Sequence, residues 1–153
     1  MIAYLSGPIE NARNDGAEWR ISITKWLKTN LGHDVFDPVV ETKSIVNENS
    51  GKDFRSLKVS EPEKYKSFIR KIIKVDLDAV VNHADYLIVK WDKSVFKGGG
   101  THGEITLAHW LGKPVYLVND LPIDDVSSWI FSCSEFIFSD FEDLKNKLIK
   151  IYK

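Results

Sequence analysis

Two short apolar runs enclose a glycine-rich segment, and this arrangement constrains the fold more than any other part of the chain. Residues 86–89 and 115–118 are the apolar runs, and between them three consecutive glycines precede a helix-like segment that ends before Pro114. Two β-rich runs joined by a helix predict a βαβ unit with parallel strands. The glycines fall where strand gives way to helix, so bare backbone can approach a ligand at the helix N-terminus.

The rest of the chain repeats this alternation of strand and helix. Further strands are expected from the apolar residues in segments 2–5, 35–36 and 136–138. Helical spacing of apolar residues predicts helices over about 15–31 and 63–82, a short helix near 123–130, and a closing helix after Asp140. The fold class is therefore predicted as α/β: a doubly wound (flavodoxin/Rossmann-like) sheet of about five parallel strands with helices on both faces.

Domain organisation follows from the length of the chain. Its 153 residues fit one domain, 1–153, with enough sequence for a sizeable core. The stretch from about 41 to 62 is polar and without period, and we expect a long irregular loop there.

Composition excludes several classes of function. The net charge of −1 provides no basic excess for a nucleic-acid backbone, and no apolar run approaches the roughly 20 residues of a membrane span. The single cysteine, Cys133, and the absence of a signal-peptide layout favour a reducing, cytoplasmic setting. The histidines show no metal-ligand spacing, so no metal is expected.

Two carboxylates stand out, and each has a structural and a functional interpretation. Glu104 lies three residues after Thr101, the spacing of a capping box in which the glutamate bonds back to the first turn. It could instead serve as a nucleophile in glycosyl transfer, next to glycines that clear room for a ligand. Asp76 lies on the apolar stripe of the 63–82 helix, so it either has a structural partner or lines a polar pocket.

Four segments, in the same order along the chain, resemble the nucleoside 2-deoxyribosyltransferase family and the related 2'-deoxynucleoside 5'-monophosphate N-glycosidases. They are residues 4–9, 76–85, 100–104 and 112–115. The resemblance implies that Glu104 is the nucleophile that takes the deoxyribosyl group. It further implies that Asp76 binds the sugar and supports the reaction, and that Tyr4 contacts the nucleophile. No cofactor is implied.

Substrate contacts are expected at the carboxyl edge of the predicted sheet, where ligands bind in folds of this kind. The candidate residues there are Ser6, Gly7, Pro8, Gly98, Gly100, Thr101 and His102. The resemblance adds Asp124 and Ser127, at positions that a neighbouring subunit donates to the site. It therefore implies a homodimer or higher homo-oligomer with shared active sites, whose partners are a nucleoside or nucleotide and a free base.

The sequence also departs from the family pattern. Gly98 stands six residues before Glu104, where the transferases commonly carry an acid and the glycosidases a serine. Glu10 stands where the glycosidases place a phosphate-binding arginine, although Arg13 and Arg20 lie near it. Two other functions stay open: a phosphoribohydrolase of the cytokinin-activating (lysine decarboxylase-like) type, suggested by the glycine-rich turn, and a sensor module that binds a nucleotide without cleaving it.

Overall fold

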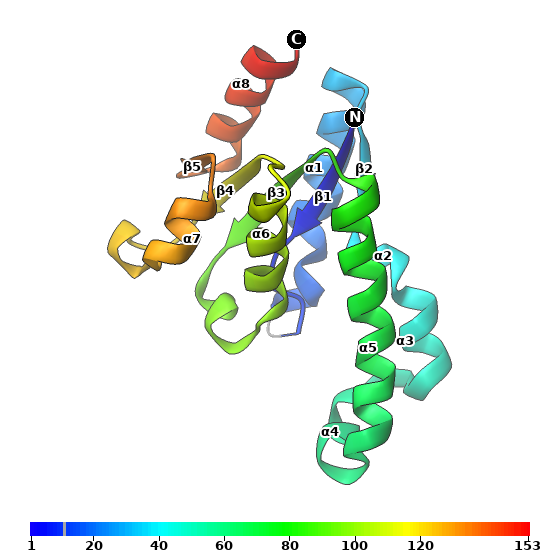
Figure 1. The fold of residues 1–153 in the computed structure, drawn as a ribbon. Coiled ribbons are helices and arrows are strands. Elements are labelled where there is room, and N and C mark those ends of the chain that lie inside the picture. The colour runs from blue at the N-terminus through cyan, green and yellow to red at the C-terminus, as the bar shows by residue number, and fades with distance from the viewer. Residues whose placement is uncertain (11) are drawn as a thin grey trace.

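Five parallel strands form one sheet in the order β2-β1-β3-β4-β5 in a computed structural model of the protein (Figure 1). The strands are β1 (Ile2–Ser6), β2 (Asp34–Phe36), β3 (Tyr86–Trp91), β4 (Val115–Asn119) and β5 (Phe136–Phe138). The structure describes residues 1–10 and 12–153, with residues 49–53 described by their backbone alone. The predicted five-stranded parallel sheet is confirmed, and its order reverses between β1 and β3, the point where doubly wound sheets bind ligands.

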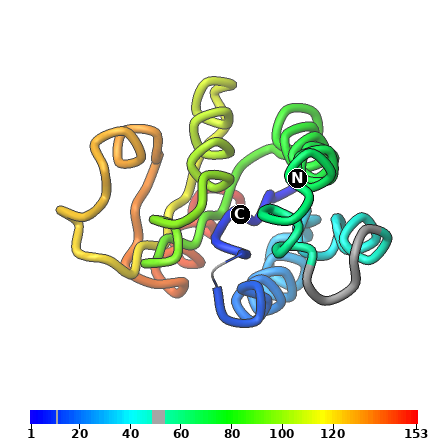
Figure 2. Tube along the Cα trace, turned by 90° about the horizontal axis from the view of Figure 1, so that it is seen from below, coloured from blue at the N-terminus to red at the C-terminus, as the bar shows by residue number. Residues whose placement is uncertain are grey.

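Helices cover both faces of the sheet, as the sequence predicted. The longer ones are α1 (Ala17–Leu31), α5 (Pro62–Asp78), α6 (Gly100–Trp110) and α8 (Phe141–Tyr152). Seen from below, α5 and α6 lie on one side of the sheet and α1 lies on the other (Figure 2). Along β3, Leu87 and Val89 join one core cluster and Ile88 joins the other, because successive strand residues point to opposite faces.

Short helices complete the chain. The α-helices are α2 (Pro38–Glu41), α3 (Lys43–Ser50), α4 (Leu57–Ser60) and α7 (Ser128–Cys133); the 3-10 helices are η1 (Arg13–Gly16), η2 (Gly51–Ser56), η4 (Lys93–Lys97) and η5 (Ile123–Asp125). No helix of the described residues is both long and apolar enough to cross a membrane.

The prediction of an irregular loop over 41–62 is wrong, because α3, η2 and α4 occupy most of that stretch (Figure 1). These short helices lie along the lower part of α5. Phe54 stacks on Tyr65 and packs edge-on against Phe68, with ring centroids 6.5 and 5.1 Å apart. Short helices of this kind depend on tertiary packing more than on a long periodic pattern, which is why the sequence pattern did not reveal them.

A π-helix, η3 (Ala79–His83), follows α5 directly, and a lysine from the segment after α6 closes it. Lys113 Nζ donates hydrogen bonds of 2.7, 2.8 and 2.7 Å to the carbonyl oxygens of Val80, Val81 and Ala84. These are carbonyls at a helix end, which have no partner within the helix and are stabilised by a cation. Lys113 therefore fixes the end of the helical segment that carries Asp76.

We predict that Lys113→Met lowers the free energy of unfolding by about 2 kcal/mol, because three carbonyls lose a charged donor while the apolar stem is retained. Urea unfolding at neutral pH measures the change. Lys66→Met, which removes a surface ion pair with Glu63, is the matched control and should cost less than about 1 kcal/mol. Equal losses in the two variants would contradict the role given to Lys113.

Candidate active site

A buried carboxylate lies at the carboxyl edge of the sheet, where α6 meets β1. The Glu104 side chain is 8% exposed and comes from the first turns of α6. Tyr4 Oη donates to Glu104 Oε1 over 2.8 Å, and Ser6 Oγ donates to Glu104 Oε2 over 2.5 Å. Tyr4 and Ser6 are two residues apart on β1, so both side chains point to the face of the sheet that α6 covers.

The capping box expected between Thr101 and Glu104 is absent from this described segment. Helix α6 begins at Gly100 with Gly99 as its N-cap, and the Gly103 N–H bonds to the Gly99 carbonyl. Thr101 therefore lies inside the helix, 7% exposed, and cannot cap it. Glu104 bonds to β1 instead of to its own helix, which removes the purely local explanation for this carboxylate.

Asp76, near the end of α5, is the second acid of the site. Its Oδ1 atom is buried and accepts no hydrogen bond from any residue the structure describes. Burial raises the pKa of Asp76 to about 8, and the nearby Glu104 carboxylate adds to the rise. An unpartnered buried carboxyl oxygen is costly in its ionised form, so Asp76 is the acid of this pair that holds a proton at neutral pH.

Glu104 has the opposite surroundings. Burial raises its pKa, whereas the hydrogen bonds from Ser6 and Tyr4 and the positive charge of Arg20 lower it. Burial, aided by the charge of Glu104, also raises the pKa of Tyr4 far above its ordinary range, so Tyr4 stays a neutral donor. Among the described residues only Glu104 of the two acids receives donors, which favours the negative charge of the coupled pair on Glu104 and the proton on Asp76.

Arg20 is a site residue whose role the sequence did not reveal. Its side chain is fully buried, and its nitrogens donate to the carbonyl oxygens of Gly7, Asp15 and Gly16, each over 3.0 Å. Its Nε lies 3.5 Å from Asp37 Oδ1. Arg20 stands three residues before Ile23 and seven before Leu27, so a charge on the apolar stripe of α1 was the signal that could have found it. Because it is so occupied, Arg20 is not free to bind a phosphate.

A cavity of about 360 Å³ opens at the point where the strand order reverses. Its lining comes from the segments after β1 and β3 and from the start of α1: Pro8, Ala12, Arg13, Gly16, Glu18, Trp19, Lys90, Asp92 and Ser94. Lys90 is ion-paired with Asp120, and Asp92 accepts a hydrogen bond from the Ser94 N–H as the N-cap of η4. The cavity therefore presents both acids and bases and no excess of positive charge.

The glycine-rich turn is open to solvent. A Cβ added at Gly98, Gly99, Gly100 or Gly103 would meet no described atom of the fold within 4 Å, and none of these glycines has a positive φ. Neither packing nor backbone conformation requires glycine there, and the start of α6 faces open space. His102 packs edge-on against the buried Trp91, with centroids 4.9 Å apart.

Asp124 and Ser127 lie on the segment that leads into α7, and both are exposed. Ser127 accepts a hydrogen bond from the Ile130 N–H and so caps its own helix. The structure thus brings Tyr4, Ser6 and Asp76 around Glu104, whereas Asp124 and Ser127 face outward from the same chain.

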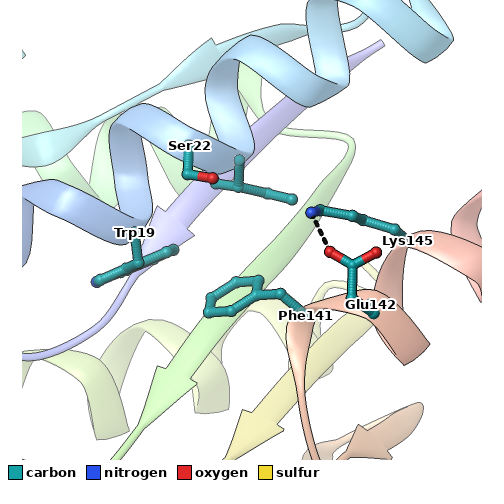
Figure 3. Close-up of a pocket in the computed structure, with 6 residues that line it drawn as sticks. Trp19, Ser22, Phe141, Glu142 and Lys145 are labelled. Carbon is teal, nitrogen blue, oxygen red and sulfur yellow. Dashed lines mark hydrogen bonds and ion pairs between the residues drawn. The ribbon is translucent and has the colours of Figure 1, made fainter.

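A smaller hollow of about 200 Å³ lies between α1 and α8 (Figure 3). Trp19 stacks on Phe141 there, with centroids 5.7 Å apart, and Lys145 is ion-paired with Glu142. Trp19 borders this hollow as well as the larger cavity, and it also lies under the Arg20 guanidinium. The hollow is on the face of the sheet opposite to Glu104, since α1 and α8 pack against the other core cluster.

Several solved structures share this fold. A 2-deoxyribosyltransferase of Bacillus psychrosaccharolyticus is 22% identical with a TM-score of 0.64, over 95% of this chain and 91% of that one. A 2-deoxyribosyltransferase of Leishmania mexicana is 14% identical with a TM-score of 0.60, over 99% of each chain. A conserved protein of Enterococcus faecalis V583 is 15% identical with a TM-score of 0.57, over 99% of this chain and 98% of its own.

No protein-family model matches the sequence. No curated protein matches it either. The comparisons therefore show that the chain has the fold of the 2-deoxyribosyltransferases, as the sequence resemblance indicated.

We predict that Asp76→Asn is more stable than the wild type at pH 9 and that the difference disappears near pH 4. The folded pKa of about 8 is above the unfolded value, so Asp76 weakens folding progressively as pH rises from about 4 to about 8. An uncharged amide removes that dependence. Urea unfolding at both pH values measures the stability difference between the variant and the wild type. Asp125→Asn, at an exposed position, is the control. A difference that is the same at both pH values would contradict a protonated Asp76.

Proposed function

We propose that this chain, which has the fold of the 2-deoxyribosyltransferases, cleaves or transfers the N-glycosidic bond of (2'-deoxy)nucleosides or their 5'-monophosphates. The observation that carries the proposal is the buried Glu104 carboxylate with its two hydroxyl donors and a second acid, Asp76, whose pKa burial and Glu104 raise. Glycosyl transfer by carboxylates needs this division of roles, one group to attack and one to hold a proton.

In the proposed first step, one Glu104 oxygen attacks C1' of the sugar as the bond from C1' to the base nitrogen breaks. The electron pair of that bond leaves with the base, and the proton held by Asp76 is available to neutralise it. Each Glu104 oxygen accepts one hydrogen bond and therefore keeps a lone pair for the attack. Tyr4 and Ser6 orient the carboxylate, which is a positioning contribution to the rate.

In the second step an acceptor attacks C1' of the glycosyl-enzyme and Glu104 leaves. A free base as acceptor gives a transferase, and water gives a hydrolase; in both cases the acceptor's proton returns to Asp76. In this proposal the sugar would lie against Glu104, near the open glycine turn at Gly98 and Gly100 and near His102.

The charges near the site favour an uncharged nucleoside over a 5'-monophosphate. Arg20 is occupied by three carbonyls and Asp37, and Lys90 is paired with Asp120. Arg13 shares its cavity with Glu18 and Asp92. A phosphate dianion is usually held by free cations or by a helix N-terminus, and the described lining offers no surplus of positive charge.

We predict that Glu104→Gln lowers base release from deoxynucleosides at least about 1,000-fold, because the neutral amide cannot attack, although its oxygen can accept from one of the two hydroxyls and its NH2 can donate to the other. Chromatography of the freed base measures the rate with deoxynucleosides and their 5'-monophosphates, with and without acceptor base. Mass spectrometry of the quenched enzyme should show the added mass of one glycosyl group in the wild type and none in the variant.

The exposed Glu135→Gln is the control and should keep wild-type activity. Unchanged turnover in Glu104→Gln would overturn the assignment of Glu104 as the nucleophile. Cleavage confined to ribonucleoside monophosphates would favour the phosphoribohydrolase. Tight binding of an intact nucleotide without base release would favour the sensor module.

We also propose a homo-oligomer in which a second copy presents Ser127 and Asp124 to the site. Trp110 on α6 and Trp129 on α7 are 83% and 65% exposed. Trp129 Nε1 donates to Thr106 Oγ1 over 2.9 Å, and Thr106 and Trp110 are four residues apart on α6, so the two indoles lie on one surface. Large exposed aromatic side chains grouped in this way are typical of an interface.

We predict that Trp110→Ser converts the oligomer to a monomer, because it removes a large apolar side chain from this surface. Light scattering coupled to gel filtration measures the mass. Ile21→Ser, which truncates an exposed side chain on α1, is the control and should leave the mass unchanged. A wild-type protein that is monomeric at micromolar concentration would contradict the proposal.

A further inference from the structure

Arg20 connects three separate segments at the carboxyl edge of the sheet. Its guanidinium bonds the Gly7 carbonyl after β1 and the Asp15 and Gly16 carbonyls before α1, and its Nε faces Asp37 after β2. Gly7 directly follows Ser6, which donates to Glu104. The position of the Ser6 hydroxyl therefore depends on a peptide that Arg20 fixes.

The segment before α1 is shaped around this guanidinium. Asn14, Asp15 and Gly16 have φ values of 51°, 52° and 68°, three successive residues in the left-handed region. Such backbone costs about 1 kcal/mol for each non-glycine residue, so it persists where other contacts hold it. A Cβ at Gly16 would lie 2.5 Å from Arg20 Nη1, which shows how closely the turn approaches the guanidinium.

The charges around Glu104 come from three elements. Tyr4 and Ser6 on β1 are neutral donors, Asp76 on α5 is a second acid, and Arg20 on α1 is the one cation that acts on Glu104 among the described residues. Asp37 in turn faces Arg20 and is the N-cap of α2, where it accepts the Val39 N–H over 3.0 Å. Water does not screen the charge of a fully buried guanidinium, and a single facing acid does not cancel it. The positive charge of Arg20 therefore also acts on other groups nearby.

We propose that Arg20 is a positioning residue of the Glu104 site, whose buried guanidinium fixes the backbone directly after Ser6 and supplies the positive charge that balances the Glu104 carboxylate. This inference rests on the proposed function for its kinetic consequences. Its electrostatic consequence concerns Glu104 alone and can be measured without substrate.

The test titrates the Glu104 side-chain carboxyl by ¹³C NMR in the wild type, Arg20→Met, Arg20→Lys and Asp37→Asn, with Glu104→Gln to assign the signal. Loss of the cation in Arg20→Met should raise the pKa of Glu104 by about one unit. Asp37→Asn should lower it, because Arg20 then loses its facing anion; the asparagine can still cap α2. Arg20→Lys keeps the charge, so the titration should stay close to that of the wild type.

Base release completes the experiment. The acidic limb of kcat/KM should move to higher pH in Arg20→Met and to lower pH in Asp37→Asn. Arg20→Lys should lower kcat about tenfold with little change in the limb, because one ammonium cannot reproduce the three directed hydrogen bonds. Arg70→Met, at an exposed position on α5, is the control and should behave as the wild type.

The outcomes separate the two proposals. Opposite titration shifts in Arg20→Met and Asp37→Asn without base release by the wild type would support the role of Arg20 and overturn the proposed function. Shifts of the same sign, or none, in an enzyme that releases base would overturn the role of Arg20 alone. If Arg20→Met does not fold, Asp37→Asn and Arg20→Lys decide: an Asp37→Asn titration unchanged from the wild type would overturn the inference.

Discussion

The hydrogen bonds from Tyr4 and Ser6 to Glu104 are the interaction on which the site depends. They join β1 to α6, residues 98 and 100 positions apart in the sequence, at the edge where the strand order reverses. Removing a carboxylate from water costs several kcal/mol unless donors replace the solvent. Because both donors come from one strand, the site and the pairing of β1 with its neighbours stabilise each other.

The two acids differ in their hydrogen-bond partners. Glu104 receives two donors and the field of a cation, whereas the buried oxygen of Asp76 receives no donor from the described chain. One proton shared by such a pair settles on the acid without donors. Helix α5 and the π-helix that Lys113 closes fix the position of Asp76. The stability of this backbone offsets part of the free-energy cost of leaving the Asp76 carboxyl without a hydrogen-bond partner.

The sequence predicted those features that depend on local pattern. The strands, the helix expected over about 15–31 and the closing helix after Asp140 follow from apolar runs and helical periods, and the structure has them. The same local reasoning failed at Thr101, whose capping spacing is correct but whose helix has Gly99 as its N-cap, two residues earlier. The sequence pattern also could not reveal the role of Arg20, because the partners of Arg20 come from three segments that only the folded sheet brings together.

The arrangement also explains why the donors to Glu104 are hydroxyls. A bidentate arginine on this carboxylate would hold its charge more firmly, but it would also occupy both oxygens with strong, charged hydrogen bonds and weaken them for bond formation. Here the guanidinium bonds the Gly7 carbonyl instead, one residue beyond Ser6, so its charge acts on Glu104 while its nitrogens do not. In the proposed mechanism the Arg20 charge favours the ionised carboxylate without contacting it, and neutral groups orient the carboxylate and leave its lone pairs available.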